Sequence, residues 1–155
     1  MRRKDREITD RLKIESIIKN THICSLGMND DGEIYVIALN FGYKFDDEKL
    51  YLYFHSAKTG RKISIMTKSP KVGFEMHSNT SLMIGETACK YSYTYESVVG
   101  NGIINFINDD EKKAETLELI MRHETDKEFK FSSEMVQNVA VFELAVQNFS
   151  CKVHK

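Results

Sequence analysis

Hydrophobic and polar residues alternate regularly between Leu50 and His55, in the run LYLYFH. Leucine or phenylalanine stands at every second position of this run, with tyrosine or histidine between them. Successive side chains of a strand point to opposite faces, so one face can enter a core while the other presents aromatic and imidazole groups. The pattern predicts a strand that ends at His55, a small-residue loop over residues 56–60, and a helix that begins at Arg61.

Other periodicities predict the remaining elements. Apolar positions at helical spacing over residues 10–20 favour an amphipathic helix, capped by Thr9 or Asp10. A second helical face follows Asn108, which we expect to be the capping residue, and ends near His123. In addition to the strand that ends at His55, we predict strands over residues 22–28, 33–43, 71–77, 91–107 and 139–151.

Three segments depart from this regular pattern. Residues 35–41, YVIALNF, are almost continuously apolar, so we expect the strand over residues 33–43 to be central in its sheet. Residues 78–90 are mostly polar and predict a long irregular loop. Residues 124–137 are also polar and predict a loop or a short helix.

The order of the elements favours a mainly β fold, an antiparallel β-barrel with peripheral helices. Gly100 and Gly102 lie inside a predicted strand and indicate a bend or bulge, as a curved sheet requires. The chain has 155 residues, and no repeat, linker or low-complexity tract divides it. We therefore expect a single domain over residues 1–155.

Composition argues against several classes of function. The 22 basic and 23 acidic side chains give a net charge of −1, so no nucleic-acid-binding surface is expected. The histidines lack metal-ligand spacing, and Cys24, Cys89 and Cys151 are far apart and odd in number, so we expect neither a metal site nor a disulfide framework. No apolar run is long enough for a membrane segment or signal peptide, and we expect a cytoplasmic protein.

The loop after His55 carries the clearest chemical signal. Gly60 is followed by Arg61 and Lys62 at the predicted start of a helix, where backbone N–H groups and two cations can meet one anion. A simple turn with solvated charges explains the same residues. The loop by itself does not distinguish such a turn from an anion-binding site. An anion held there would most simply be a phosphate.

The stretch FHSAKTGRK, from Phe54 to Lys62 and followed by Ser69-Pro70, resembles the flavin-phosphate motif of the pyridoxamine-phosphate-oxidase-like split barrels. Its form is most similar to the branch that contains the nitroimidazole-resistance proteins. The resemblance implies an FMN-binding split barrel with six or more antiparallel strands in a Greek-key-like arrangement. It also implies FMN as the cofactor and a homodimer with the cofactor at its interface.

The resemblance also implies which residues form the site. His55, Ser56 and Ala57 would follow the polar edge of the flavin ring, and a second subunit would add Ser97 and Val98, with Tyr95 and Glu96 nearby. The other predicted cofactor-binding residues are Ile37, Ala38, Leu39 and Asn40 at the ring, and Gly60, Arg61 and Lys62 at the phosphate.

The implied activity is that of a flavin-dependent oxidoreductase acting on a small electrophilic substrate such as a nitroaromatic compound. His55 would either donate a proton to the product or only hydrogen-bond the cofactor or backbone. The C-terminal residues 146–155, VQNFSCKVHK, show no equivalent of the extra basic residues with which true pyridoxamine-phosphate oxidases hold the phosphate of their substrate, so we do not expect that activity. The alternative is a protein that binds flavin, haem or a deazaflavin without turnover, with His22, His77 or His123 as an axial haem ligand.

Overall fold

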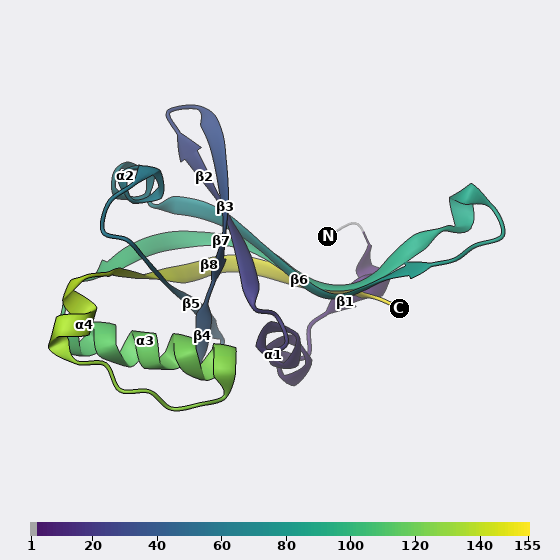
Figure 1. The fold of residues 1–155 in the computed structure, drawn as a ribbon. Coiled ribbons are helices and arrows are strands. Elements are labelled where there is room, and N and C mark those ends of the chain that lie inside the picture. Colours follow the sequence, from purple (N-terminus) through teal and green to yellow (C-terminus); the bar gives the residue numbers. More distant parts are fainter. Residues whose placement is uncertain (1–2) are drawn as a thin grey trace.

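The strands form one antiparallel sheet that curves round on itself (Figure 1). The order along the sheet is β3-β2-β6-β7-β8-β5-β4, and the short β1 pairs with β8. β3 and β4 lie at opposite ends of this order, yet only Phe41 separates them in the sequence. The two ends of the sheet must therefore approach each other, which produces the barrel that the sequence predicted.

The computed structural model describes residues 3–155. Its helices are the 3₁₀ turns η1 (Lys4–Arg6) and η2 (Ala88–Lys90) and the α-helices α1 (Arg11–Lys19), α2 (Arg61–Lys68), α3 (Asp110–Thr125) and α4 (Ser133–Gln137). Its strands are β1 (Glu7–Ile8), β2 (Ile23–Asp30), β3 (Glu33–Asn40), β4 (Gly42–Asp46), β5 (Lys49–Ser56), β6 (Lys71–Met83), β7 (Ser92–Ile107) and β8 (Ala140–His154).

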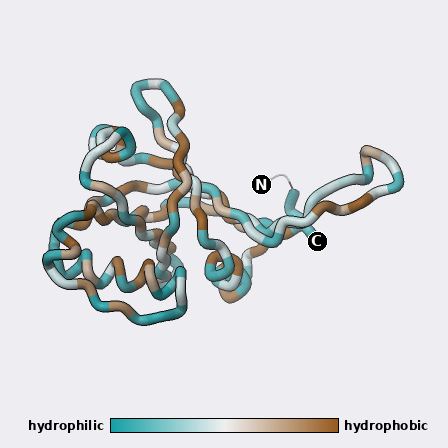
Figure 2. The backbone as a smooth tube through the Cα atoms, in the orientation of Figure 1, coloured by the Kyte–Doolittle hydropathy of each residue, from teal (hydrophilic) through white to brown (hydrophobic). Residues whose placement is uncertain are grey.

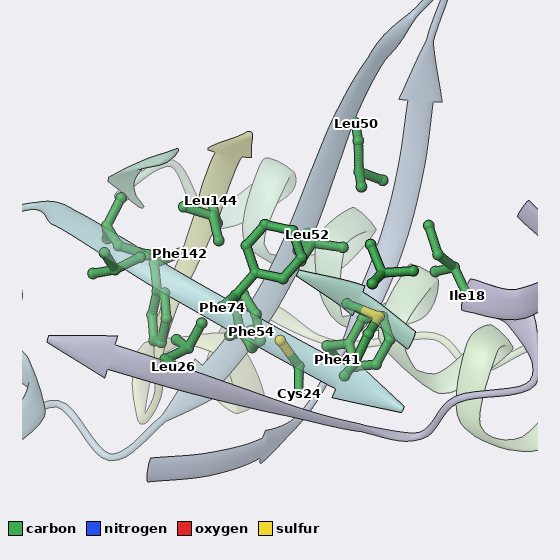
Figure 3. Packing of buried hydrophobic residues seen from close by; sticks show 14 of the residues in the cluster. Ile18, Cys24, Leu26, Phe41, Leu50, Leu52, Phe54, Phe74, Phe142 and Leu144 are labelled. Atoms are coloured by element: carbon green, nitrogen blue, oxygen red, sulfur yellow. The ribbon is translucent and has the colours of Figure 1, made fainter. Parts of the chain in front are cut away.

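The barrel core is built from the inward faces of these strands (Figure 3). Leu50, Leu52 and Phe54 of β5 are at most 1% exposed, which confirms the alternation that predicted this strand. The ring of Phe54 stacks on Phe142 of β8, with 5.5 Å between ring centres. Burying several aromatic side chains at one point supplies a large share of the hydrophobic stabilisation of a domain this size.

The helices begin close to where the sequence placed them. The side chain of Asp10 accepts a hydrogen bond from the backbone N–H of Lys13 and caps α1, as predicted. The cap of α3 is Asp109 and not Asn108, because its carboxylate reaches the N–H of Lys112. α3 and α4 together cover the outer face of β5 and β8, where a second apolar cluster of Leu117, Ile120, Val136 and Val141 forms.

The apolar run over residues 35–41 does not form a central strand. β3 is an edge strand, and the strand predicted over residues 33–43 is divided at Phe41 into β3 and β4. Ile34 and Val36 are 75% and 61% exposed on its outer face. The prediction was wrong because an apolar strand face can remain uncovered within a single chain, which a sequence pattern does not reveal.

The loop predicted over residues 78–90 is wrong for residues 78–83 and confirmed for residues 84–90, which contain only the turn η2. β6 continues to Met83 and forms with β7 a two-stranded arm that projects beyond the barrel (Figure 1). Figure 2 shows a hydrophobic segment on this arm, and Leu82 and Ile84 are exposed. The register shifts between Ser78 and Ser81, where Asn79 has a φ of 55°, and this bulge hides the regular pairing from a pattern analysis.

The bend predicted in the long strand is present in β7. The pairing of β7 with β8 shifts register between Asn101 and Gly102. A Cβ on Gly102 would overlap the carbonyl oxygen of Ala145, so only glycine fits this close approach. Within residues 3–155, no helix has the length and hydropathy of a membrane-spanning segment.

Candidate functional site

The motif segment leaves the barrel at the end of β5 and enters α2. Ser56 still pairs with Ala140 of β8, whereas residues 57–60 are exposed. Gly60 has a φ of 126°, which residues with a side chain rarely adopt. A Cβ there would meet nothing within 4 Å, so glycine is required by the backbone conformation and not by lack of space. Gly60 therefore sets the direction in which α2 starts.

The first turn of α2 has no side-chain cap. Gly60 occupies the N-cap position and offers no side-chain acceptor. The N–H groups of a first turn lack intrahelical partners and favour an anion. Arg61 and Lys62 stand in the same turn. The structure thus places backbone donors and two cationic residues in one turn, in the strand, loop and helix order that the sequence predicted.

Arg61 is paired with two carboxylates of the β2–β3 hairpin. Its Nε donates to Oδ2 of Asp30 at 2.9 Å, and its Nη2 donates to Oε2 of Glu33 at 3.2 Å. The hydrogen bond to Asp30 is the main cause of a raised pKa for Arg61. Neither acid was predicted from the sequence, because both lie about 30 residues before Arg61 and belong to no motif. An anion at α2 must therefore share Arg61 with these carboxylates or bind through Lys62, which forms no ion pair within residues 3–155.

His55 points away from the barrel core into a small apolar pocket beneath α3 and α4. Burial lowers the pKa of His55, because it disfavours the cationic form. The imidazole is therefore neutral at neutral pH, with one nitrogen able to donate and the other able to accept. The pocket has a volume of about 230 Å³, and its other lining residues are Leu117, Ile120, Met121, Phe131, Met135 and Val139.

One wall of this pocket comes from residues 124–137, to which the sequence assigned no part in the site. Phe131 and Met135 lie in residues 124–137, which were predicted as a loop or short helix without a functional role. The available signal was the presence of large apolar side chains in an otherwise polar segment. Val136 of α4 is fully buried, so this segment packs on the barrel and fixes the pocket wall.

His55 also differs from the other histidines in its hydrogen bonding. Within residues 3–155, its ring makes no hydrogen bond or ion pair. The other rings are engaged: His22 with Glu124, His77 with Glu75, His123 with the Phe41 carbonyl and His154 with the Tyr93 carbonyl. Among the same residues, no group of three or more His, Cys, Asp or Glu side chains could hold a metal ion. An uncommitted imidazole in an apolar pocket is available to a ligand.

The predicted ring-binding residues of β3 lie on both faces of this edge strand. Ile37 and Leu39 pack against the core, whereas Ala38 is exposed on the outer face. Asn40, the last residue of β3, is half-buried. In this chain, Ala38 is therefore the member of this group whose side chain is most open to a ligand.

Ser97 and Val98 point in opposite directions on β7. Val98 is completely buried in the core, so only its backbone can face a ligand, while Ser97 is half-buried on the outer face. Ser97 lies on the same face of the sheet as Ala38, because paired residues share a face and so do residues two apart on one strand. The register connects them through the pairs Ala38–Ser25, Ser25–Glu75 and Glu75–Val99, and Val99 follows Ser97 by two residues.

Tyr95 and Glu96 are occupied by contacts within the chain. The Tyr95 hydroxyl accepts a hydrogen bond from Arg6 at 3.3 Å. Glu96 is buried, accepts a hydrogen bond from Asn79 at 2.6 Å, and lies 3.5 Å from the ammonium of Lys13. These two residues join the base of the β6–β7 arm to the N-terminal segment.

Comparison with known proteins gives a consistent result. The pyridoxamine 5'-phosphate oxidase family model matches residues 10–153. The structure is similar to that of a candidate 5-nitroimidazole antibiotic resistance protein from Bacteroides thetaiotaomicron, with 36% identity over 95% of this chain and 86% of that chain and a TM-score of 0.81. No curated protein matches this chain in sequence.

Two further structures share the fold at low identity. An FAD and heme binding protein from Mycobacterium smegmatis has 15% identity and a TM-score of 0.83, over 97% of this chain and 74% of that chain. A flavocytochrome from Azotobacter vinelandii has 20% identity and a TM-score of 0.80, over 100% of this chain and 72% of that chain. The predicted mainly β split barrel is thus confirmed. The family match over nearly the whole chain shows that this protein belongs to the pyridoxamine 5'-phosphate oxidase family, in which it is similar to the nitroimidazole-resistance branch.

Proposed function

We propose that this protein binds FMN and is a flavin-dependent oxidoreductase that reduces a small electrophilic substrate such as a nitroaromatic compound. The observation that carries the proposal is the uncapped first turn of α2 with Arg61 and Lys62, in a chain 36% identical to a candidate nitroimidazole resistance protein. True pyridoxamine-phosphate oxidase activity is not part of the proposal.

The first turn of α2 fits the phosphate of FMN. A dianionic phosphate needs several donors, and backbone N–H groups, a guanidinium fork and an ammonium supply them without a metal ion. Gly60 allows the backbone to approach the phosphate closely. The residues proposed to contact the flavin ring are Ile37, Ala38, Leu39, Asn40, His55, Ser56 and Ala57.

When bound, FMN supplies the hydride-transfer chemistry. The chain's own contribution is the pocket around His55. Its walls are apolar, and the neutral imidazole can donate an N–H hydrogen bond to the reacting group; a proton would be delivered only by the cationic form, which burial disfavours. A His55→Ala protein that binds FMN and retains full turnover would contradict this role.

The proposed site is completed by a second copy of the chain. The outer sheet face that carries Ala38 and Ser97 also exposes Ile34, Val36 and Val99. Exposed apolar side chains that cluster on one face mark an interaction surface. A homodimer through this face would bring Ser97 of each subunit toward the site of the other. Analytical ultracentrifugation tests this, and a monomer that binds FMN fully would contradict it.

The direct test of the proposed function is the absorbance spectrum of the purified protein, with mass analysis of any cofactor released by heat. We expect an oxidised flavin spectrum and the mass of FMN, followed by turnover with a nicotinamide donor and a nitroaromatic acceptor. A colourless protein that fails to take up added FMN would contradict the proposal.

Binding without turnover is the second candidate, because one structural neighbour is an FAD and heme binding protein and another a flavocytochrome. Haem would require an axial ligand, and His22, His77 and His123 are each engaged with a group of the chain itself. This arrangement favours a flavin or a deazaflavin over haem. A Soret band in the spectrum would show the opposite.

A further inference from the structure

A large cleft is lined by residues of α1, β4 and α3 and contains none of the residues assigned to FMN. Its volume is about 680 Å³, which is within the range of small-molecule sites. Tyr43 and Phe45, two residues apart on β4, contribute aromatic surface. Leu12 of α1 and Leu119 of α3 add apolar surface, and Leu12 is 76% exposed. The cleft can therefore accept an aromatic ring.

The walls of the cleft are held in place by His123 at the end of α3. Its Nδ1 lies 2.7 Å from the carbonyl oxygen of Phe41, and its Nε2 lies 3.3 Å from that of Lys19. The ring also packs edge-on against Tyr43, with 5.2 Å between ring centres. α3 is thereby joined both to α1 and to the β3–β4 junction. The cleft exists before any ligand enters, which lowers the entropic cost of binding.

Positive charge is concentrated around this cleft. Lys19 of α1, Lys44 of β4 and Arg122 of α3 line it, and none of them forms an ion pair within residues 3–155. The acidic lining residues are Glu15, which lies 3.4 Å from Arg11, and Asp126. Three uncompensated cations therefore face one free carboxylate, in a chain whose net charge is −1. Such a cleft favours an anionic ligand.

Arg11 also lines the cleft and is held there by contacts within the chain. Its guanidinium carbon lies 3.3 Å from the ring centre of Phe45, and its Nη1 donates to the carbonyl oxygen of Asp47 at 2.8 Å. Its Nε is buried and has no hydrogen-bond partner. A buried N–H without an acceptor is unfavourable, and most such groups are satisfied in folded proteins. Arg11 therefore joins α1 to Phe45 and to the β4–β5 turn and helps to fix this wall of the cleft.

We propose that the cleft between α1 and α3 is a binding site for a small aromatic carboxylate. The aromatic part packs against Tyr43 and the leucines of the two helices, and the carboxylate pairs with Lys19 and Arg122 at the rim. This site is independent of the FMN site, because none of its residues belongs to the motif segment or to the outer sheet face.

The test is binding of 2-naphthoate to the purified protein, measured by calorimetry beside 2-naphthalenemethanol and 2-naphthylmethylamine. We expect the carboxylate to bind at least about tenfold more tightly than the alcohol, because hydrogen bonds to charged groups are worth more than neutral ones, and the amine to bind most weakly. Equal affinity for the three compounds would overturn the proposal.

Charge-removing variants locate the site. The double variant K19Q/R122Q should weaken 2-naphthoate binding at least about tenfold. The matched control K49Q/K71Q removes the same charge from exposed positions outside the cleft and should bind as the wild type does. Unchanged affinity in K19Q/R122Q, or an equal loss in both double variants, would overturn the proposal. Both variants change exposed side chains, and circular dichroism verifies that they fold.

Two further measurements exclude binding at the FMN site, and one further variant tests the cleft itself. The variant R61A/K62A should keep its affinity for 2-naphthoate, and saturating FMN should not displace the ligand. Leu12→Glu places a carboxylate on the exposed rim and should reduce binding as strongly as K19Q/R122Q does. Displacement of 2-naphthoate by FMN would assign it to the flavin site and overturn the proposal.

Discussion

The two ends of the motif segment lie in opposite environments. Arg61 and Lys62 stand in an exposed turn, and Arg61 is paired with Asp30 and Glu33. His55, at the other end, faces an apolar pocket and makes no hydrogen bond within residues 3–155. Exposed cations keep their charge without a desolvation cost and can hold an anion, whereas an apolar pocket favours a neutral group such as the imidazole of His55. One short segment can thus supply both the anchor and the reactive surface of a flavin site.

The largest expected effect is at the charged end. R61A/K62A should weaken FMN binding at least about 100-fold, because it removes two charged hydrogen-bonding groups from the phosphate. Titration of the protein with FMN measures this. The control K68A/K71A removes two charges near the C-terminal end of α2, where Lys68 is the last helical residue and Lys71 lies three residues further, and should leave the affinity for FMN unchanged. Equal FMN affinity in R61A/K62A and wild type would show that the phosphate lies elsewhere.

At the apolar end we expect an effect on turnover and not on binding. His55→Gln should lower the rate of nitroaromatic reduction by about 100-fold or more, as loss of a positioned proton donor does, while FMN affinity remains. Steady-state kinetics and flavin titration separate the two effects. His77→Gln is the matched control, since His77 is exposed and paired with Glu75. A full rate in His55→Gln would leave His55 with no more than a binding role.

The junction between the two ends depends on Gly60. Gly60→Ala should destabilise the protein by about 1–3 kcal/mol, because the backbone there adopts a conformation nearly restricted to glycine. Gly27→Ala is the control, as a Cβ there meets nothing closer than 3.9 Å and its φ is not in that region. Urea unfolding measures both. Equal stability of the two variants would argue against strain at Gly60.

Acid should destabilise the protein partly through His55. Its pKa is lowered on folding, so below its ordinary value of 6.5 the unfolded chain binds a proton more readily than the folded one. The free energy of unfolding therefore decreases as the pH falls through 6.5, and it should decrease less in His55→Gln. Urea unfolding at several pH values tests this. Parallel pH profiles for wild type and variant would contradict a lowered pKa of His55.

The smallest effect concerns the carboxylates that hold Arg61. D30N/E33Q should tighten FMN binding by up to about fivefold, because exposed ion pairs are worth about 1 kcal/mol or less and both acids repel a phosphate. Flavin titration at low ionic strength measures this, with D46N/D47N as a control at the β4–β5 turn. Weaker FMN binding in D30N/E33Q would mean that the two acids position Arg61 for the phosphate.

The sequence alone determined the local features. The alternation from Leu50 to His55, the cap of α1 at Asp10 and the turn at Gly60 each depend on neighbouring residues, so a pattern can identify them. The family resemblance rested on the same continuous stretch, and the family match confirmed it. The residues that bind the cofactor remain a prediction, because no contact within one chain tests them.

Only the tertiary structure decided the non-local features. It placed the apolar strand β3 at an edge, extended the polar residues 78–83 into the β6–β7 arm, and paired Arg61 with the β2–β3 hairpin. It also put α3 and α4 over His55. Each of these results depends on which distant segments become neighbours when the sheet curves, and apolar periodicity records whether a residue can be buried but not what covers it.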